Sequence, residues 1–205
     1  MYRAYPIHVP QALLAAFRKL GVDPILVGGA VVEVWTGRRD GVFHTADLDF
    51  IGPDFLTAYQ VQKVNPDGIE AISGRHVWVE SVPIEFPMGP LGIGSALLDP
   101  ATATVEVKTL AGDTIRCFRP EACVLDRLTA VAYEYGHFEQ YIQALAVASA
   151  QCGEPDWSHD WIEATAREAR LSRLWAYVAD EIASGETRQE RLDEAMRIGW
   201  DPLGL

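Results

Sequence analysis

Two short apolar segments of the sequence end in residues that could bind a phosphorylated ligand and a metal ion. The first runs into the glycine pair Gly28-Gly29, and the second, after a gap of 17 residues, carries Asp47-Leu48-Asp49. Side chains on a strand alternate between its two faces, so Asp47 and Asp49 should share a face while Leu48 enters the core. Paired carboxylates suit Mg²⁺, and a glycine turn at a helix N-terminus lets the backbone approach a phosphate closely.

The order of these parts resembles the nucleotidyltransferase superfamily. The pattern of that superfamily is an apolar residue, Gly, then Gly or Ser, a short helix, and Asp-x-Asp. The form in this chain, Gly28-Gly29 followed by Thr45-x-Asp47-x-Asp49, looks most like the AbiEii-type toxins and related branches. The resemblance implies Mg²⁺-dependent transfer of a nucleoside monophosphate from a nucleoside triphosphate (NTP) to a hydroxyl acceptor. A toxin of this kind would also have an antitoxin protein as partner.

The resemblance further implies a third carboxylate on a neighbouring strand. Glu85 is the best candidate, because it lies between the apolar residues Ile84 and Phe86 in a segment rich in β-formers. It could complete the metal site, or it could accept the proton of the attacking hydroxyl. An outward-facing surface role is the alternative, and Glu80 and Glu106 are rival candidates in other β-rich runs.

Several other residues are candidates for contact with the nucleotide. Thr45 either supports the loop before the Asp-x-Asp strand or meets the substrate. Arg38, Arg39 and Arg75 could bind phosphate oxygens bidentately, although an exposed arginine beside a loop is common. Arg127 occupies the place where related toxins often carry a lysine in a Lys-Leu-x-Ala helix. Its alternative is an ion pair with an acid of its own helix.

Simpler explanations exist for each of these motifs. The glycine pair could be a plain turn between a strand and a helix, since it lacks the dinucleotide-binding and P-loop patterns. The two aspartates could lie on a solvated strand edge, but two like charges on one face repel each other without a cation. None of the five histidines has the spacing of metal ligands, so we expect them to be structural.

The composition is typical of a folded protein, with 49% hydrophobic and 22% charged residues. No apolar stretch approaches the length needed to span a bilayer, and the first residues lack the apolar segment of a signal peptide. The three cysteines form no Cys-x-x-Cys motif and suggest neither a disulfide framework nor a zinc site. These features predict a cytoplasmic protein.

The net charge of −12 is unevenly distributed along the chain. Residues 1–119 contain 13 acids and 10 bases, a balance of −3, whereas residues 120–205 contain 16 acids and 7 bases, a balance of −9. An acidic surface repels nucleic acids and attracts cationic ligands or basic proteins. The alternative is that these acids only keep a helical region soluble.

The elements that must position the motifs can be read from periodicity and turn residues. In the first part of the chain we expect helices at 10–20, 30–36 and 53–64, strands at 25–27, 47–51 and 75–86, a loop at 87–103 and a hairpin at 105–118. In the second part we expect one continuous helix over 124–145, a second over 160–182, and a third over 187–198 that opens with a capping box.

These elements predict an α+β fold with a nucleotidyltransferase-like domain at 1–119 and a helical domain at 120–205. The first function hypothesis is the enzyme, whose acceptor could be a cationic small molecule, a protein or an RNA end. The second is a catalytically degenerate nucleotidyltransferase fold that acts as a nucleotide-binding or protein-binding regulatory module. A third is an acidic interaction protein in which the Asp-x-Asp motif is incidental.

Overall fold

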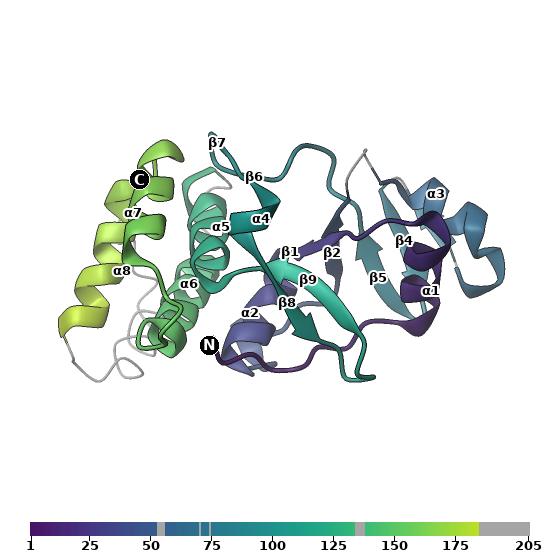
Figure 1. Cartoon of the computed structure of the whole chain (residues 1–205), viewed down its shortest axis with the longest axis horizontal. Helices are drawn as coiled ribbons and strands as arrows, with labels where there is room; N and C mark the ends of the chain where they lie inside the picture. Colours follow the sequence, from purple (N-terminus) through teal and green to yellow (C-terminus); the bar gives the residue numbers. More distant parts are fainter. Residues whose placement is uncertain (53–55, 70, 74, 134–137, 185–205) are drawn as a thin grey trace. The chain divides into compact units, whose positions relative to one another are not determined.

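The computed structural model describes residues 1–52, 56–69, 71–73, 75–133 and 138–184, apart from the side chains of 71–73 and 138 (Figure 1). The chain forms two compact units. The first, called the sheet unit, contains Ala4–Leu91 and Leu98–Arg119. The second, called the helical unit, contains Met1–Arg3, Gly92–Leu97 and the residues from Pro120 on. As functional domains, the ranges 1–119 and 120–205 remain a prediction.

A mixed sheet of seven strands, in the order β3-β4-β5-β2-β1-β9-β8, forms the centre of the sheet unit. Its parallel pairs are β1 with β9 and β2 with β5, and its other neighbours are antiparallel. The elements of the unit are α1 (Gln11–Leu20), β1 (Ile25–Val27), α2 (Gly29–Thr36), η1 (Gly41–Phe43), β2 (Leu48–Ile51), α3 (Ala58–Val64), η2 (Pro66–Gly68), β3 (Ala71–Ser73), β4 (His76–Val79), β5 (Val82–Glu85), α4 (Pro100–Ala103), β8 (Thr104–Lys108) and β9 (Thr114–Phe118). The predicted α+β class is therefore confirmed.

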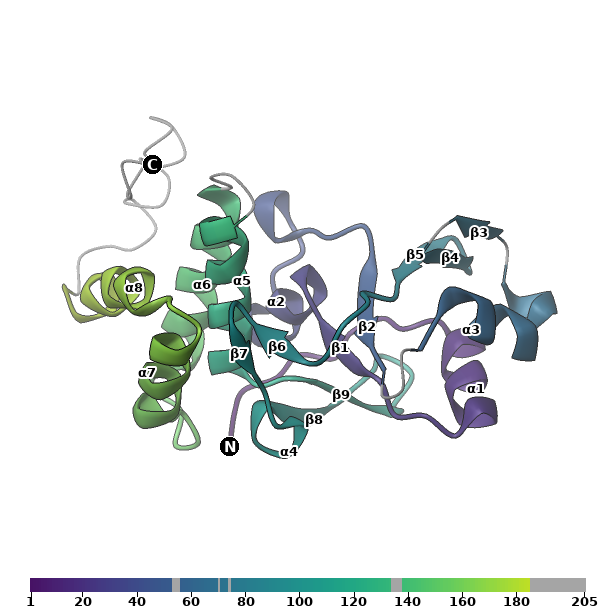
Figure 2. The same ribbon diagram turned by 90° about the horizontal axis from the view of Figure 1, so that it is seen from above.

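One face of this sheet is packed and the other carries polar residues at the centre. Phe50 of β2 is buried, and its ring lies 5.2 Å from that of Phe17 on α1 in an edge-to-face arrangement. Helices α1 and α3 lie side by side (Figures 1 and 2). Because β2 alternates buried and half-buried residues, burial of Leu48 and Phe50 turns Asp49 to the opposite face. Core packing thus fixes the direction in which the carboxylates point.

Most of the predicted elements of the sheet unit are present, but the loop prediction for 87–103 is wrong. This segment contains the short strands β6 (Gly92–Ile93) and β7 (Ala96–Leu97), which pair with each other, and then α4. Asp99 caps α4 by accepting a hydrogen bond from the N–H of Ala101, and Pro100 follows at the first helical position. The Asp99-Pro100 pair is typical of a helix start, so α4 could have been predicted from the sequence. Of the helix predicted at 53–64, residues 58–64 are helical and 53–55 lie outside the described residues.

The helical unit contains β6, β7 and the four helices α5 (Pro120–Tyr133), α6 (Phe138–Gln151), α7 (His159–Glu168) and α8 (Ser172–Ser184). The prediction of one continuous helix over 124–145 is wrong, because α5 and α6 are separate helices that pack side by side (Figures 1 and 2). The apolar spacing continues from one helix into the other and hides the break. Gly136, which falls between them in the sequence, disfavours a helix interior by about 1 kcal/mol relative to alanine.

The helix predicted over 160–182 is also two helices. Arg170, between α7 and α8, has a left-handed φ of 62°. The N–H of Leu171 bonds to the carbonyl oxygen of Ala166 at 2.7 Å, and the N–H of Arg170 to that of Arg167 at 3.2 Å. These two bonds form a Schellman motif, which normally has glycine at the left-handed position. The predicted third helix at 187–198 lies outside the described residues.

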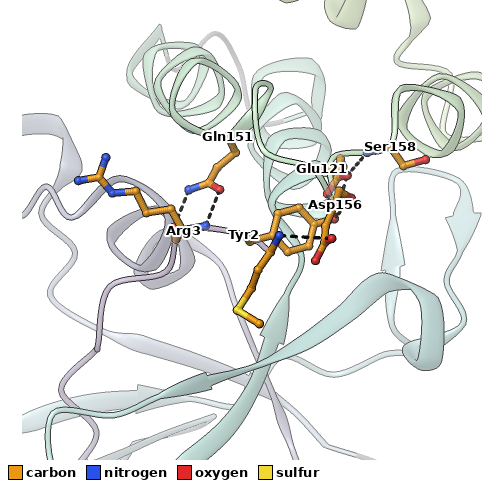
Figure 3. A network of polar contacts seen from close by, with 7 residues as sticks. Tyr2, Arg3, Glu121, Gln151, Asp156 and Ser158 are labelled. Atoms are coloured by element: carbon orange, nitrogen blue, oxygen red, sulfur yellow. Dashed lines mark hydrogen bonds and ion pairs between the residues drawn. The ribbon is translucent and has the colours of Figure 1, made fainter.

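The first residues of the chain belong to the helical unit through a polar network (Figure 3). Glu121 is fully buried, and its carboxylate accepts hydrogen bonds from the Tyr2 hydroxyl at 3.0 and 3.1 Å and from the N–H of Ser158 at 2.6 Å. The side-chain amide of Gln151 bonds to both backbone groups of Arg3. A buried carboxylate requires such partners, so this network is structural. Among the described residues, no helix is long and apolar enough to cross a membrane.

Replacement of Arg170 by glycine is expected to raise the free energy of unfolding by about 0.5–1 kcal/mol, because the side chain is exposed and glycine adopts a left-handed φ without strain. Arg167→Gly is the matched control: it removes the same charge from inside α7 and should cost about 1 kcal/mol. Denaturant unfolding of both variants measures the difference. Equal effects would mean that the left-handed position carries no strain.

Candidate active site

Three carboxylates meet on the polar face of the sheet. The parallel pairing of β2 with β5 places Asp49 level with Glu85, and Asp47 precedes β2 on the same side as Asp49. One carboxylate oxygen from each of Asp47, Asp49 and Glu85 lies within 4.8 Å of the others, and all three residues are half-buried. The structure therefore brings together the three residues that the sequence predicts as a metal site. Their role as ligands remains a prediction.

Glu85 has two basic partners in the structure. Its Oε1 lies 2.6 Å from a terminal nitrogen of Arg75, and its Oε2 lies 2.9 Å from Nε2 of His76. His76 reaches Glu85 because the antiparallel pairing of β4 and β5 sets the two residues directly opposite each other. A carboxylate offers about four lone-pair positions, so both contacts leave room for a metal ion. Partners of this kind orient a ligand and tune its basicity.

Gly28 lies directly beneath Asp49. Its φ of 73° and ψ of −157° fall in a region that is essentially restricted to glycine. A Cβ at this position would overlap the Asp49 carboxylate. Gly28 is buried, whereas Gly29, which begins α2, is half-buried. The glycine pair therefore adjoins the carboxylates as expected, but a phosphate would meet the exposed part of Gly29 rather than Gly28.

Thr45 connects the glycine turn to the carboxylates. A Cβ on Gly29 would lie 3.2 Å from the Thr45 side chain, so the two residues are in close contact. The Thr45 hydroxyl donates a hydrogen bond of 2.7 Å to Oδ1 of Asp47. This bond holds the Asp47 carboxylate in one orientation. Thr45 thus has the supporting position that the sequence suggests, and contact with a nucleotide remains a prediction.

Glu33 on α2 anchors the loop that carries Thr45. Its carboxylate accepts a hydrogen bond from the N–H of Thr45 and pairs with Arg39, whose Nε lies 3.1 Å from Oε2. Burial raises the pKa of the Glu33 carboxyl, while Arg39, the Thr45 N–H and His44 oppose that rise. The Arg39 guanidinium also donates to the carbonyl oxygen of Pro6 at 2.8 Å. These contacts favour a structural role for Arg39 over its predicted contact with phosphate.

The other predicted arginines also have acidic neighbours. Arg38 lies over the ring of Phe43, with its guanidinium carbon 3.8 Å from the ring centroid, and 3.7 Å from Asp40. Arg127 belongs to the helical unit, where its Nε and a terminal nitrogen lie 3.1 and 2.6 Å from Asp126. This is the ion pair within one helix that was the alternative to nucleotide binding. Contact of Arg127 with a nucleotide remains a prediction.

Neither rival of Glu85 joins the cluster. Glu80 lies in the turn between β4 and β5 and accepts a hydrogen bond from the N–H of Ala12 at the start of α1. Glu106 is exposed on β8, opposite Arg116 of β9. Among the described residues, the group of acids and histidines placed to hold a metal ion is Asp47, Asp49 and Glu85.

His76 and Glu33 were not predicted from the sequence as residues of the site. His76 was assigned a structural role because its spacing to other histidines is not that of a metal site, yet it lies against Glu85. Strand alternation indicates this contact only once the two-residue turn at Glu80-Ser81, which pairs His76 with Glu85, is known. Glu33 gave no such pattern, since a single acid on a short helix is common.

The donor set fits Mg²⁺. Three carboxylates provide hard oxygen ligands, and an ion with octahedral preference usually takes one or two carboxylates and completes its shell with water or phosphate oxygens. Three negative charges so close together also repel one another, and a divalent cation relieves that repulsion. No cysteine or histidine ligand set accompanies them among the described residues, which disfavours a soft metal.

No protein-family model matches the chain, and no curated protein sequence matches it. Among solved structures, an antigenic nucleotidyltransferase-like protein from Paracoccidioides brasiliensis is similar to it, with 18% sequence identity, a TM-score of 0.54, and coverage of 89% of this chain and 90% of that chain. The antibiotic-resistance factor ANT(2'')-Ia is similar at 17% identity and a TM-score of 0.43, covering 91% of this chain and 94% of that chain. The same factor in complex with adenylyl-2''-tobramycin gives 16% identity and a TM-score of 0.42, with 93% and 95% coverage. The likeness to the first of these proteins, together with the mixed sheet, shows that this chain has the nucleotidyltransferase-like fold.

Proposed function

We propose that the protein is a Mg²⁺-dependent nucleotidyltransferase that moves a nucleoside monophosphate from an NTP to a hydroxyl acceptor. The observation that carries this proposal is the convergence of Asp47, Asp49 and Glu85 beside the Gly28-Gly29 turn, on a fold of this class. Carboxylates that can hold a metal ion and a glycine turn with an accessible backbone amide are the two parts that a metal–triphosphate site would use.

In the proposed reaction the acceptor hydroxyl oxygen attacks the α-phosphorus in line. The new O–P bond forms as the bond from the α-phosphorus to the oxygen that bridges to the β-phosphate breaks, and pyrophosphate leaves with that electron pair. The hydroxyl proton passes to water or to Glu85. When bound, Mg²⁺ supplies charge neutralisation on the phosphate oxygens.

The protein's own contribution is positioning. Asp49 is held by the backbone of β2 and Asp47 by the Thr45 hydroxyl, so they need not reorganise during the reaction. Gly29 offers the amide of the first helical residue, a group that the helix itself leaves without an acceptor. The triphosphate would therefore lie on the β1 side of the carboxylates.

The net charge of −12 favours a cationic small molecule or a basic protein as acceptor over an RNA end. A role as the toxin of a toxin–antitoxin pair rests on the sequence resemblance alone. One observation favours the regulatory alternative: both oxygens of Glu85 already contact Arg75 and His76. In that case the protein would bind nucleotide without releasing pyrophosphate.

Release of pyrophosphate separates these two functions. The protein is incubated with each of the four NTPs and Mg²⁺, together with an aminoglycoside, a basic protein or an RNA with a free 3′ hydroxyl. Enzyme function predicts pyrophosphate and a nucleotidylated acceptor in at least one combination, both abolished by EDTA and restored by added Mg²⁺. NTP binding with no product in any combination would support the regulatory module.

Replacement of Thr45 by valine is expected to lower the rate of transfer or the affinity for Mg²⁺ about 10- to 100-fold, because Asp47 loses the donor that orients it. Thr104→Val on β8 is the control, since its hydroxyl donates to the carbonyl oxygen of Pro100. Steady-state kinetics and Mg²⁺ titration measure both variants. If Thr45→Val matches the control, orientation of Asp47 by Thr45 has no role in the reaction.

A further inference from the structure

Strand order limits where the acceptor can approach, on the premise of the function proposed above. In an in-line displacement the attacking and leaving oxygens lie on opposite sides of the phosphorus. The strands of this region follow the order β4-β5-β2-β1. Gly29 adjoins β1, whereas the three carboxylates lie on β5, on β2 and directly before β2. With pyrophosphate leaving on the β1 side, the acceptor has to enter over β5 and β4.

The surface on that side contains an exposed tryptophan. Trp78 on β4 is 42% exposed, whereas its neighbours Val77 and Val79 are fully buried. Residues two apart on a strand share a face, so Trp78 lies on the same face as His76, which contacts Glu85. Trp78 pairs with Pro83 of β5, two residues before Glu85.

Trp78 also lies level with Asp47, the first residue of the Asp-x-Asp motif. The register of β2 and β5 pairs Leu48 with Ile84, and continued by one residue it brings Asp47 level with Pro83. Trp78, Pro83 and Asp47 therefore form one row across three neighbouring strands. Two strand spacings separate the ends of that row, about 10 Å. An acceptor of one or two rings spans this distance.

Trp78 is exposed because it lies on the polar face of the sheet, the face that also carries the carboxylates. Among the described residues, Trp35, Trp157 and Trp175 are each no more than 8% exposed, and Trp161 is half-buried. Because β4 lies inside the sheet between β3 and β5, Trp78 is exposed on the open face of the sheet and not at its edge. An indole left open beside a polar site is typical of a ligand-stacking surface, because it offers a large rigid face at little cost in conformational entropy.

We propose that Trp78 forms the floor of the acceptor subsite, and that this subsite takes a ring-bearing alcohol with a positively charged amine. The indole face attracts cations and stacks on flat ring faces. The carboxylates beside it and the net charge of −12 attract the same ligands. Trp78 thereby sets the choice of acceptor and leaves the binding of the NTP to the glycine turn and the carboxylates.

The test measures acceptor and nucleotide separately. Tobramycin and other aminoglycosides serve as cationic probes, and sucrose serves as an uncharged polyol. Trp78→Ala is expected to weaken aminoglycoside binding, or raise its KM, at least about tenfold, while the KM for NTP changes less than about twofold. Trp78→Phe should recover most of the loss, because it keeps an aromatic face. Tyr59→Ala, which removes another exposed aromatic ring from α3, is the control.

Three results would overturn the inference. Trp78→Ala could match Tyr59→Ala in aminoglycoside affinity and in both KM values, which would make Trp78 an incidental surface residue. The NTP constant could change instead of the acceptor constant, which would assign Trp78 to the nucleobase. The parent protein could bind Mg²⁺ and NTP together yet bind no aminoglycoside, or bind sucrose equally well. In each of these cases Mg²⁺-dependent NTP binding by the parent would leave the proposed function intact.

Discussion

Replacement of Asp49 by asparagine is expected to lower nucleotidyl transfer by about 10³-fold or more, equivalent to about 4 kcal/mol of transition-state stabilisation. The amide keeps the shape of the carboxylate but removes one of three negative charges that would hold the metal. The free energy of unfolding should stay equal or rise slightly, because repulsion from Asp47 and Glu85 is relieved. Pyrophosphate release and denaturant unfolding measure the two effects.

Glu106→Gln is the matched control for this variant. It removes one negative charge from an exposed position on β8, outside the carboxylate cluster. Its rate of transfer should equal that of the parent. An Asp49→Asn protein that retains activity, or one that unfolds under conditions where the parent is stable, would show that Asp49 serves the fold rather than the metal.

Replacement of Gly28 by alanine is expected to lower the free energy of unfolding by about 2–4 kcal/mol and to abolish transfer. The backbone conformation of Gly28 costs other residues about 1–3 kcal/mol. The added methyl group also overlaps the Asp49 carboxylate, which has to move. Two effects, backbone strain and a displaced ligand, therefore act together.

Two further variants separate these effects. Gly21→Ala, at a φ of 67° with nothing within 4 Å of the new Cβ, reports the cost of a positive φ without overlap and should leave transfer unchanged. In the Gly28→Ala/Asp49→Ala double variant the overlap with the carboxylate is removed and a Cβ–Cβ contact of 3.3 Å is left, so the variant should be more stable than the sum of the two single effects predicts. Strict additivity would mean that Gly28 and Asp49 do not compete for space.

The pair of aspartates and the turn beside them could be predicted from the sequence because both depend on local rules. Strand alternation puts Asp47 and Asp49 on one face wherever the strand lies in the sheet. Gly28 marks a backbone conformation that costs other residues about 1–3 kcal/mol. Local rules do not predict that Glu85 joins the two aspartates. Its position depends on parallel pairing between β2 and β5, strands that are far apart in the sequence. Its position between apolar neighbours made Glu85 the best of three candidates for the third carboxylate, but it did not exclude Glu80 or Glu106.

The turn between β4 and β5 explains why His76 was missed. Glu80 and Ser81 both have positive φ, at 52° and 65°, where a two-residue hairpin of this type normally has Asn-Gly. Because neither Asn nor Gly stands at this turn, the sequence does not show how β4 and β5 pair. Without that register, the contact of His76 with Glu85 cannot be predicted. The break at Arg170 escaped prediction in the same way, because an arginine occupies a position typical of glycine.

The helix boundaries in the second part of the chain show the limit of periodicity. The apolar spacing over 124–145 is that of a single amphipathic helix, and nothing in that spacing distinguishes one helix from two that pack together. Only tertiary contact between α5 and α6 settles the matter. The partner of Arg39 could not be predicted for a related reason: whether its guanidinium meets a phosphate or Glu33 depends on the fold of the loop that carries it.

Linkage between Mg²⁺ and NTP tests the central claim most directly. Calorimetric titration of a non-hydrolysable NTP analogue, with and without Mg²⁺, measures the coupling in the parent and in Asp49→Asn. We predict that Mg²⁺ tightens binding of the analogue to the parent, and that both ligands together at about 100 times the dissociation constant add about 2.7 kcal/mol of stability. Asp49→Asn should lose this coupling. Analogue binding that is independent of Mg²⁺, or coupling that survives in Asp49→Asn, would contradict a metal-dependent nucleotide site at Asp47, Asp49 and Glu85.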